Sequence, residues 1–513
     1  MLQLFFNGPV LDFDWVYFDD DINILLNPHL TGDAWETGKW ASTDLSYTRR
    51  YMPLGWLLFD GLLAVGGLNP AVYHLAGWLL AAGNSILLFL IVRKICTWQQ
   101  PSSAWQDACA FAAVVVLSLH PWRAETAGWC SGLLYLAGQF LASLAVLAAW
   151  QPVQSDKRRI LSAGLFALAL LVYPVFLSLP LIMVLAEVAL FPPDGGSGRW
   201  FAAIRRYGAW LVVALVLGGL NWFGAATAGQ GFTATTDLAG YSLAERWTHF
   251  TALGSHYVGG LLWPGETSPF YGTASWLGTR VLPRNATLVA LAVATGFLVW
   301  PRTRTRAGLI LGLLTASLLP FVGLLDQHQT ANDRYTFLLL AVATVLLARL
   351  LMQVPPGHRR TAVLGSAILL AMLMLPHFRQ ALAVWTDTEH LQARIDRITA
   401  SQPEARLTYA RPAITACLLG RNEQAADRLA AGVARLGPHP EIMAAIEFIR
   451  QTNEQSAARS GDRPGVAPYA LLHLEIARNQ RTGGRLRAAE AHELFAGRLL
   501  ARQEGAVAPG PPK

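Results

Sequence analysis

Residues 71–94 read AVYHLAGWLLAAGNSILLFLIVRK, and the rest of the chain is best interpreted from this stretch outward. The part from 71 to 92 carries no Asp, Glu, Lys or Arg, and the basic pair Arg93-Lys94 follows it directly. A helix of about 20 apolar residues is long enough to cross the hydrocarbon core of a bilayer. The stretch therefore predicts a membrane-spanning helix that ends at a basic loop.

The composition of the whole chain indicates a membrane body with a soluble part. Of the 513 residues, 53% are hydrophobic and only 14% are charged, whereas soluble globular proteins carry roughly 25% charged residues. The charges are also unevenly distributed, because residues 381–513 hold 31 of them and the first 380 residues hold the other 42. This pattern excludes an ordinary soluble enzyme and predicts an apolar body followed by a soluble C-terminal domain.

Ten apolar stretches have the length or the setting of membrane spans. Several are shorter than about 20 residues, and we expect neighbouring helices to bury them. Pro174 and Pro180 are expected to kink or end helices in the middle of the chain. The predicted spans are 71–92, 107–119, 131–150, 160–175, 177–191, 207–225, 286–300, 307–324, 335–353 and 361–377. The sequence thus predicts an all-α polytopic membrane protein with about ten transmembrane helices.

Basic residues follow every second predicted span, which sets the expected orientation. Cytoplasmic loops are enriched in Lys and Arg, so these basic loops should face the cytoplasm. The alternate loops and the C-terminal domain should then lie outside. Only four of the 40 basic residues are Lys, a bias typical of a GC-rich bacterial genome. We therefore expect a bacterial inner membrane, with the outer loops (1–70, 120–130, 226–285 and 325–334) in the periplasm.

Charge and cysteine content exclude two further classes of protein. The formal net charge is +7, but the basic residues lie at loop ends and form no single soluble basic face, so no nucleic-acid partner is expected. The four cysteines have neither CxxC nor metal-ligand spacing, which indicates apolar packing residues and no disulfide framework.

The N-terminal stretch MLQLFFNGPVLDFDWVYF leaves two alternatives open. It is too short and too acidic to span a membrane, and it lacks the pattern of a signal peptide. An outer N-terminus with nothing to carry it across favours a first helix lost to a misplaced start codon. The alternative is a tail that is translocated without a leader.

Three adjacent carboxylates, Asp19, Asp20 and Asp21, follow an aromatic cluster in the first outer loop. Adjacent carboxylates repel one another, so at least one should have a raised pKa or a cationic partner. Such a group suits a general base, or a ligand for a hard cation such as Mg²⁺ or Mn²⁺. The alternative is a solvated acidic loop or a helix N-cap.

Other outer loops place cationic and acidic residues at span ends. The second reads His120-Pro121-Trp122-Arg123-Ala124-Glu125, and the ninth span begins Asp333-Arg334-Tyr335. An arginine entering a membrane is costly unless it is used, so Arg123 and Arg334 are candidates to hold an anionic head group. The alternatives are an interfacial Arg–Glu pair and simple snorkelling. Residues 53–67 and 241–263, the second of which contains His256, should form helices that lie in the interface.

Residues 378–505 are predicted to form a soluble α-helical domain, and residues 506–513 a disordered end. The patterns near 418–440 and 469–500 resemble helix–turn–helix repeats, with Gly483-Gly484 at the second turn. Two units at most are visible, whereas tetratricopeptide repeats normally stack three or more. Two interpretations remain: a module that docks on the membrane body and holds a protein partner, or a plain helical bundle.

Taken together, the polar segments resemble those of the membrane O-mannosyltransferases with C-terminal tetratricopeptide repeats and their bacterial relatives, members of the GT-C superfamily. The resemblance covers roughly residues 15–440. The chain departs from the family at Met52, where Arg is frequent, at Ala81, where His is common, and at 173–176, which lacks the usual charged residue. The matching segments are Phe18-Asp19-Asp20-Asp21 with Asn27-Pro28; Tyr51-Met52-Pro53-Leu54 with Trp56 and Asp60; Asn69-Pro70 with Tyr73-His74 and Asn84; His120-Pro121-x-Arg123-x-Glu125 with Trp129; Leu262-Trp263-Pro264 with Tyr271; Asp333-Arg334-Tyr335-Thr336; and Trp385-x-Asp387-x-Glu389.

The resemblance implies a GT-C-like body over 71–377, behind an outer-face region at 1–70. Such enzymes move a sugar from a polyprenyl-phosphate carrier to a protein hydroxyl or a glycan on the outer face, with inversion. The implied general base is Asp20, with Asp19 as its partner. The other implied roles are phosphate binding by Arg334, Arg123 and Arg50; substrate positioning by His120, Glu125, Asp333, Tyr335 and His256; and a divalent cation, where one is used, at Asp19 and Asp21.

Two other classes of function compete with this interpretation. A GT-C-like membrane scaffold without catalysis would bind a partner through its helical C-terminal domain, and the departures from the family favour it. A lipid or sugar transporter would need ionisable residues at mid-depth or inverted repeats with broken helices, and the spans show few of the former and no obvious sign of the latter.

Overall fold

The computed structural model describes the membrane body and the C-terminal domain in several ranges. These are residues 8–45, 47–97, 103–151, 155–190, 198–227, 256–257, 259–261, 267–268, 313–314, 316–317, 332–400, 403, 405–460 and 468–505. Within these ranges every regular element is helical, in agreement with the predicted fold class. The predicted spans 286–300 and 307–324 and the loop 226–285 lie wholly or almost wholly outside the described residues, as does the predicted tail 506–513.

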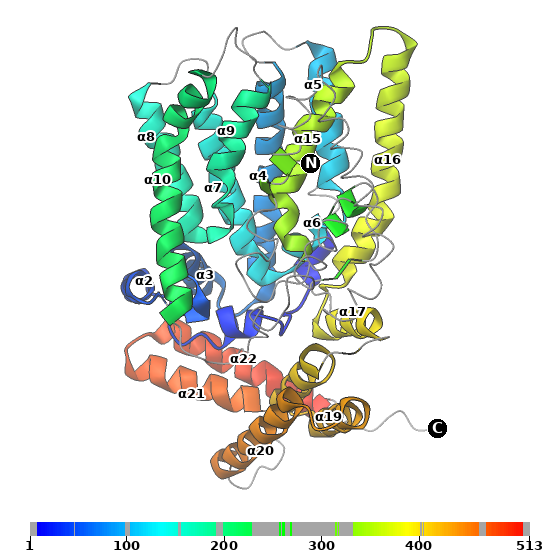
Figure 1. The fold of residues 1–513 in the computed structure, drawn as a ribbon. Helices are drawn as coiled ribbons and strands as arrows, with labels where there is room; N and C mark the ends of the chain where they lie inside the picture. The colour runs from blue at the N-terminus through cyan, green and yellow to red at the C-terminus, as the bar shows by residue number, and fades with distance from the viewer. Residues whose placement is uncertain are drawn as a thin grey trace.

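The body is a bundle of long helices that run side by side (Figure 1). Five stretches in the described residues are long and apolar enough to cross a membrane: Pro70–Cys96, Cys130–Ala149, Trp200–Gly224, Asp333–Met352 and His358–Ala383. This indicates a membrane protein, while the count of about ten spans stays a prediction. The bundle helices are α4 (Pro70–Cys96), α5 (Ala104–Ser118), α7 (Leu133–Ala149), α8 (Asp156–Val172), α9 (Leu179–Leu190), α10 (Gly198–Thr227), α15 (Phe337–Met352) and α16 (His358–Ala383).

Local sequence explains where several of these helices begin and end. Asn69 caps α4 by accepting a hydrogen bond from the backbone N–H of Ala71, and Pro70 occupies the first helical position. Ser103 and Gln106 form a capping box at the start of α5. Pro174 begins a short 3₁₀ turn, η5 (Pro174–Phe176), between α8 and α9. The predicted break in this region is therefore present.

Apolar side chains cover the outward faces of the bundle. On α4, Leu79 and Ile86 are 55% and 59% exposed, and on α16 Met372 is 64% exposed. A soluble protein rarely leaves such large contiguous apolar surfaces open to water. The outward faces and the helix lengths together fit a bundle that is surrounded by lipid.

The basic loops that lie within the described residues are at one end of the bundle. Arg93 Nε lies 2.8 Å from Asp107 Oδ1 of α5, and Lys94 Nζ donates to the Leu147 carbonyl of α7 at 3.3 Å. The acidic N-terminal segment and the C-terminal domain lie at the opposite end, below the bundle in Figure 1. This separation agrees with the predicted alternation of loops. Which end faces the periplasm stays a prediction.

The C-terminal domain is a set of paired helices joined by glycine turns. Gly420, Gly437 and Gly484 all have positive φ angles, of 79°, 71° and 77°, which explains the choice of glycine at these turns. The predicted turn at Gly483-Gly484 is confirmed, and the assignment as tetratricopeptide repeats stays a prediction. The helices are α17 (Thr388–Thr399), α18 (Arg411–Leu418), α19 (Asn422–Leu436), α20 (Pro440–Ser460), α21 (Pro468–Thr482) and α22 (Leu486–Gly505).

The domain packs against the N-terminal region before α4, the predicted first outer loop, which also carries α2 (Ala34–Thr43) and α3 (Pro53–Gly66). Gln480 Nε2 donates to the Pro28 carbonyl at 3.1 Å, and Arg485 Nη2 lies 3.2 Å from Glu36 Oε2. A side chain at Gly67 would come within 3.3 Å of the Ala491 side chain. The C-terminal domain is therefore docked on the membrane body, and whether it also holds a protein partner stays a prediction.

Candidate functional site

The acidic segment, residues Asp19–Asp21, is held between the start of α7 and the start of the C-terminal domain. On its N-terminal side, Asp14 N donates to the Thr386 carbonyl at 2.9 Å. Tyr17 N donates to Thr388 Oγ1, also at 2.9 Å. These contacts pin the chain before the segment, so the three carboxylates project from a fixed backbone.

Asp20 is completely buried and its two oxygens are occupied. Oδ1 accepts hydrogen bonds from Ser131 N at 2.8 Å and Ser131 Oγ at 2.6 Å, and Oδ2 accepts from Val16 N at 3.1 Å. Burial raises the pKa of Asp20 to about 7, against the opposing effect of these three donors. Asp20 thus connects the acidic segment to the turn η4 (Cys130–Gly132) that leads into α7.

Asp19 differs from its neighbour because its side chain is 35% exposed. Its Oδ1 lies 3.4 Å from Arg411 Nη2, a residue of the C-terminal domain. Its charge also contributes to the environment of Arg50, whose pKa is raised chiefly by Tyr173 and further by Tyr335, Tyr135 and Asp19. Asp19 is therefore the accessible carboxylate of the segment, and it lies near two arginines.

Asp21 contacts a tyrosine of the C-terminal domain. Its Oδ2 accepts from Tyr469 Oη at 3.3 Å, whereas its buried Oδ1 has no hydrogen-bond partner among the described residues. Burial raises the pKa of Asp21, and the nearby Arg411 opposes that rise. In the described part of the chain no three His, Cys, Asp or Glu side chains lie together as a metal site would require. A divalent cation at Asp19 and Asp21 stays a prediction.

Two arginines flank three tyrosines beside the acidic segment, in what we call the arginine–tyrosine cluster (Arg50, Tyr135, Tyr173, Tyr335 and Arg334). The Arg50 guanidinium lies 5.4 Å from the centre of the Tyr173 ring, and that of Arg334 lies 5.1 Å from the Tyr335 ring. The hydroxyls of Tyr135 and Tyr173 are 2.9 Å apart. The cluster concentrates positive charge and hydroxyl donors in one place, which is the chemistry that recognises a phosphate.

Glu125 fixes the position of Arg334. Its two carboxylate oxygens accept from Arg334 N at 2.8 Å and from Arg334 Nη1 at 2.9 Å, and both side chains are almost buried. The Arg334 guanidinium also lies 5.6 Å from the Trp129 ring. Burial raises the pKa of Glu125 to about 7, and Arg334 opposes that rise. The predicted outer loops 120–130 and 325–334 thus meet through this pair.

The other predicted site residues make contacts outside the arginine–tyrosine cluster. His256 Nε2 lies 3.3 Å from Asp333 Oδ1, so these two form a pair of their own. His120 Nε2 lies 3.1 Å from the Gly260 carbonyl. Arg123 Nη1 donates to Gln139 Oε1 of α7 at 3.0 Å. These contacts explain how each side chain is held. None of them joins the side chain to the acidic segment.

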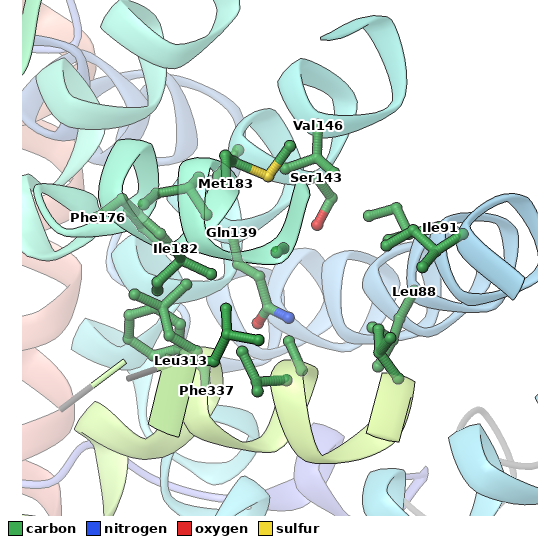
Figure 2. Close-up of a pocket in the computed structure, with 18 of the residues that line it drawn as sticks. Leu88, Ile91, Gln139, Ser143, Val146, Phe176, Ile182, Met183, Leu313 and Phe337 are labelled. Carbon is green, nitrogen blue, oxygen red and sulfur yellow. The ribbon is translucent and has the colours of Figure 1, made fainter. Parts of the chain in front are cut away.

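An apolar groove lies between helices of the bundle (Figure 2). It has an empty volume of about 830 Å³, part of it open, and it lies between α4, α7, α9 and α15. Gln139, Phe176 and Phe337 line it, and each follows a tyrosine of the cluster by two to four residues in the chain. Tyr135 and Gln139 lie one turn apart on the same face of α7. These short steps along the chain place one end of the groove near the cluster.

Four residues of the site were missed by sequence reasoning. Tyr135 and Tyr173 lie at span ends, where aromatic residues are common for reasons of interfacial depth alone. Ser131 had no signal in the sequence. Arg411 contacts Asp19 across 392 positions, and a single sequence carries no trace of such a contact.

The comparisons with known proteins returned nothing similar: no protein-family model, no curated protein and no solved structure matches this chain. Function is therefore inferred from the residues and their geometry. The resemblance to GT-C glycosyltransferases stays a prediction.

Proposed function

We propose that this protein is a membrane glycosyltransferase of the GT-C type. In this proposal it moves a sugar from a polyprenyl-phosphate carrier to a hydroxyl of a protein or glycan acceptor, on the periplasmic face of a bacterial inner membrane. One observation carries the proposal: an apolar groove between the helices lies close in the chain to a cluster of arginines and tyrosines, and an accessible carboxylate, Asp19, acts on one of those arginines, Arg50.

The groove and the cluster match the two halves of such a donor. A polyprenyl chain needs an apolar path between helices, and the groove is lined almost entirely by apolar side chains of four helices. Its phosphate needs cations and hydrogen-bond donors at the polar end of that path, which Arg50, Arg334 and the tyrosine hydroxyls supply. Charge grows on this phosphate as it leaves, so fixed cations there lower the barrier. Arg123, held by Gln139 on the groove, is placed to support the same head group.

The geometry favours Asp19 over Asp20 as the general base. A base must come within hydrogen-bond reach of the acceptor hydroxyl, and Asp20 is 0% exposed with both oxygens occupied. We therefore reverse the roles that the sequence suggested: Asp19 accepts the proton and Asp20 holds the segment in place. The acceptor oxygen attacks C1 of the sugar, the bond from C1 to the phosphate oxygen breaks, and the lipid phosphate leaves with the electron pair. A single displacement of this kind inverts the configuration at C1.

The test is sugar transfer in membranes that contain the wild type or Asp19→Asn, supplied with labelled polyprenyl-phosphate sugars. Asn keeps the shape of the side chain but cannot take the proton, so transfer should fall by roughly 100- to 10,000-fold at equal protein level. The matched control is Asp156→Asn, because Asp156 is 92% exposed and is the first residue of α8, at the other end of the bundle. Labelled nucleotide sugars are the negative control for the donor. They lack the polyprenyl chain and should give no transfer.

Three outcomes decide the proposal. Transfer that is unchanged in Asp19→Asn refutes the assigned base, and the same assay on Asp20→Asn then tests the alternative. Transfer that is lost in a chelator and restored by Mg²⁺ or Mn²⁺ shows a metal-dependent enzyme, for which Asp19 and Asp21 are the candidate ligands, and refutes a purely cationic side-chain site. No transfer by the wild type from any polyprenyl-phosphate sugar refutes the enzyme.

A second candidate function is a catalytically inactive scaffold that binds a protein partner through the C-terminal domain. The observation that favours it is a set of apolar side chains exposed on adjacent helices of that domain. Val433 on α19 is 37% exposed, and Met443 on α20 is 46% exposed. A scaffold would transfer no sugar as wild type, Asp19→Asn or Asp156→Asn, which separates it from the enzyme.

A further inference from the structure

The C-terminal domain contributes an arginine to the acidic segment. Arg411, the first residue of α18, donates from Nη2 to the Phe18 carbonyl, and the same nitrogen lies 3.4 Å from Asp19 Oδ1. Its guanidinium also lies 4.3 Å from the centre of the Phe18 ring. One side chain thus contacts the backbone, the ring and the carboxylate of two consecutive residues. Such a contact fixes both the position and the direction of the segment.

A second residue of the same domain contacts the other end of the segment. Tyr469 of α21 donates to Asp21 Oδ2 at 3.3 Å, and its ring centre lies 5.1 Å from that of Tyr17. Tyr469 is 1% exposed, so this contact is part of the packed interface between the domain and the first outer loop. Arg411 and Tyr469 therefore hold the segment from two different helices.

The chemistry of the segment explains why it needs such support. Three adjacent carboxylates repel one another, and a loop that carries them gains freedom and solvation by moving into water. Arg411 supplies a positive charge at one end, and Tyr469 supplies a hydroxyl donor at the other. On the far side, Ser131 holds Asp20 against the membrane body. The segment is thus clamped between the C-terminal domain and α7.

We infer that the C-terminal domain is an integral part of the acidic site, and that Arg411 and Tyr469 are positioning residues that hold Asp19 in its working place. This inference rests on the proposed function in one respect, the role of Asp19 as the base. Positioning of a base matters because a displacement of about 1 Å can lower a rate by about 100-fold. Undocking of the domain would then switch off transfer without any change in the donor groove.

The experiment compares Arg411→Gln with Arg411→Lys in the full chain, reconstituted in lipid nanodiscs. The first readout is hydrogen exchange of the amides in residues 16–26, which needs no substrate. The second is the split between kcat and the donor KM. In Arg411→Gln, exchange should rise about tenfold and kcat should fall about tenfold or more, with the donor KM within about twofold of the wild type. Lysine keeps the charge, so Arg411→Lys should restore part of both.

Two further variants keep the experiment interpretable. Arg421→Gln is the matched control, because Arg421 lies in the same domain and its exposed ion pair with Glu389 does not touch the segment. Tyr469→Phe keeps the ring and removes only the hydroxyl that contacts Asp21. It should therefore raise the exchange of the segment less than Arg411→Gln does.

The outcomes separate this inference from the proposed function. Unchanged exchange in Arg411→Gln overturns the inference whatever the activity. Raised exchange with an unchanged kcat also overturns it, because Asp19 then needs no clamp. If the wild type transfers no sugar from any donor, the proposed function fails. The role of Asp19 as a positioned base then fails with it, and the exchange data still decide whether the domain holds the segment.

Discussion

Asp60 and the acidic segment lie at the same end of the molecule, but the structure uses their carboxylates differently. Asp60 on α3 is 1% exposed, and its Oδ1 accepts from Thr31 N at 2.7 Å, Gly32 N at 2.7 Å and Thr37 Oγ1 at 2.8 Å. Asp19 has no such set of donors in the described residues and faces Arg411 at 3.4 Å with part of its surface open. A carboxylate whose donors converge holds a loop, whereas one that is partly exposed and makes few hydrogen bonds can be reached by a substrate hydroxyl.

Asp20 shows that a structural carboxylate and a reactive one can be neighbours in the chain. It is as buried as Asp60 and accepts three hydrogen bonds, yet it is next to Asp19 in the chain. The π-helical turn η2 (Asp21–Leu25) begins directly after it. The local backbone thus turns consecutive side chains toward different partners. Sequence position alone does not tell a structural carboxylate from a reactive one.

The largest effect on stability is expected from Asp60→Ala. The substitution removes the Asp60 acceptor of two backbone N–H groups and one of the two acceptors within reach of the Thr37 hydroxyl, and should lower the free energy of unfolding by about 3 kcal/mol. Thermal unfolding of the purified protein measures this. The rate per folded molecule should change less than about threefold, because Asp60 is outside the proposed reaction. A folded Asp60→Ala protein with no transfer activity would contradict the purely structural role given to Asp60.

The next effect is a pH dependence that Asp20 imposes on stability. Its pKa is about 7 in the folded chain and near 3.8 without the fold. Between these values the folded state binds more protons than the unfolded state, so stability should fall as pH rises from about 4 to 7. Asp20→Asn removes this contribution. Glu125 and Asp21 have raised pKa values as well, so the useful quantity is the difference between wild type and variant.

The measurement is the melting temperature of both proteins at several pH values. The stability of wild type relative to Asp20→Asn should decrease from pH 4 to pH 7. Parallel curves would show that Asp20 has the same pKa in both states and is not the buried anchor described above. Asp156→Asn provides the baseline, since its side chain is almost fully exposed.

Hydropathy predicted much of the bundle because bilayer thickness sets a minimum length for each span. The predicted span 131–150 matches Cys130–Ala149, and 71–92 lies within Pro70–Cys96. The last described span continues past 377 to Ala383 because Pro376 lies inside the helix and does not end it. Neighbouring helices and water can satisfy the backbone group that such a proline frees. Local sequence cannot show whether that happens.

The site was predictable only in part, for a physical reason. Charge pattern pointed to the segment Asp19–Asp21 and to Arg123 and Arg334, because an arginine that enters a membrane is costly without a purpose. Arg50 was suggested only by the family resemblance. Which of them meet depends on contacts between distant segments. Glu125 binds Arg334 across 209 positions, and Arg411 reaches Asp19 across 392. No periodicity or spacing in one sequence encodes those pairs.

The smallest effect is expected from Ser131→Ala, and it tests the anchor most directly. The substitution removes the 2.6 Å hydrogen bond to Asp20 but keeps the one from the Ser131 backbone, so it should destabilise the protein by about 1 kcal/mol. Because the lost donor favours the charged carboxylate, the pKa of Asp20 should rise further. Ser131 Oγ also accepts from Asn23 at 3.2 Å, so a double-mutant cycle is needed. Measured at pH 7, Ser131→Ala should cost less in Asp20→Asn than in the wild type. Equal costs in both backgrounds would mean that the serine stabilises Asn23 and that Asp20 is not held by its hydroxyl.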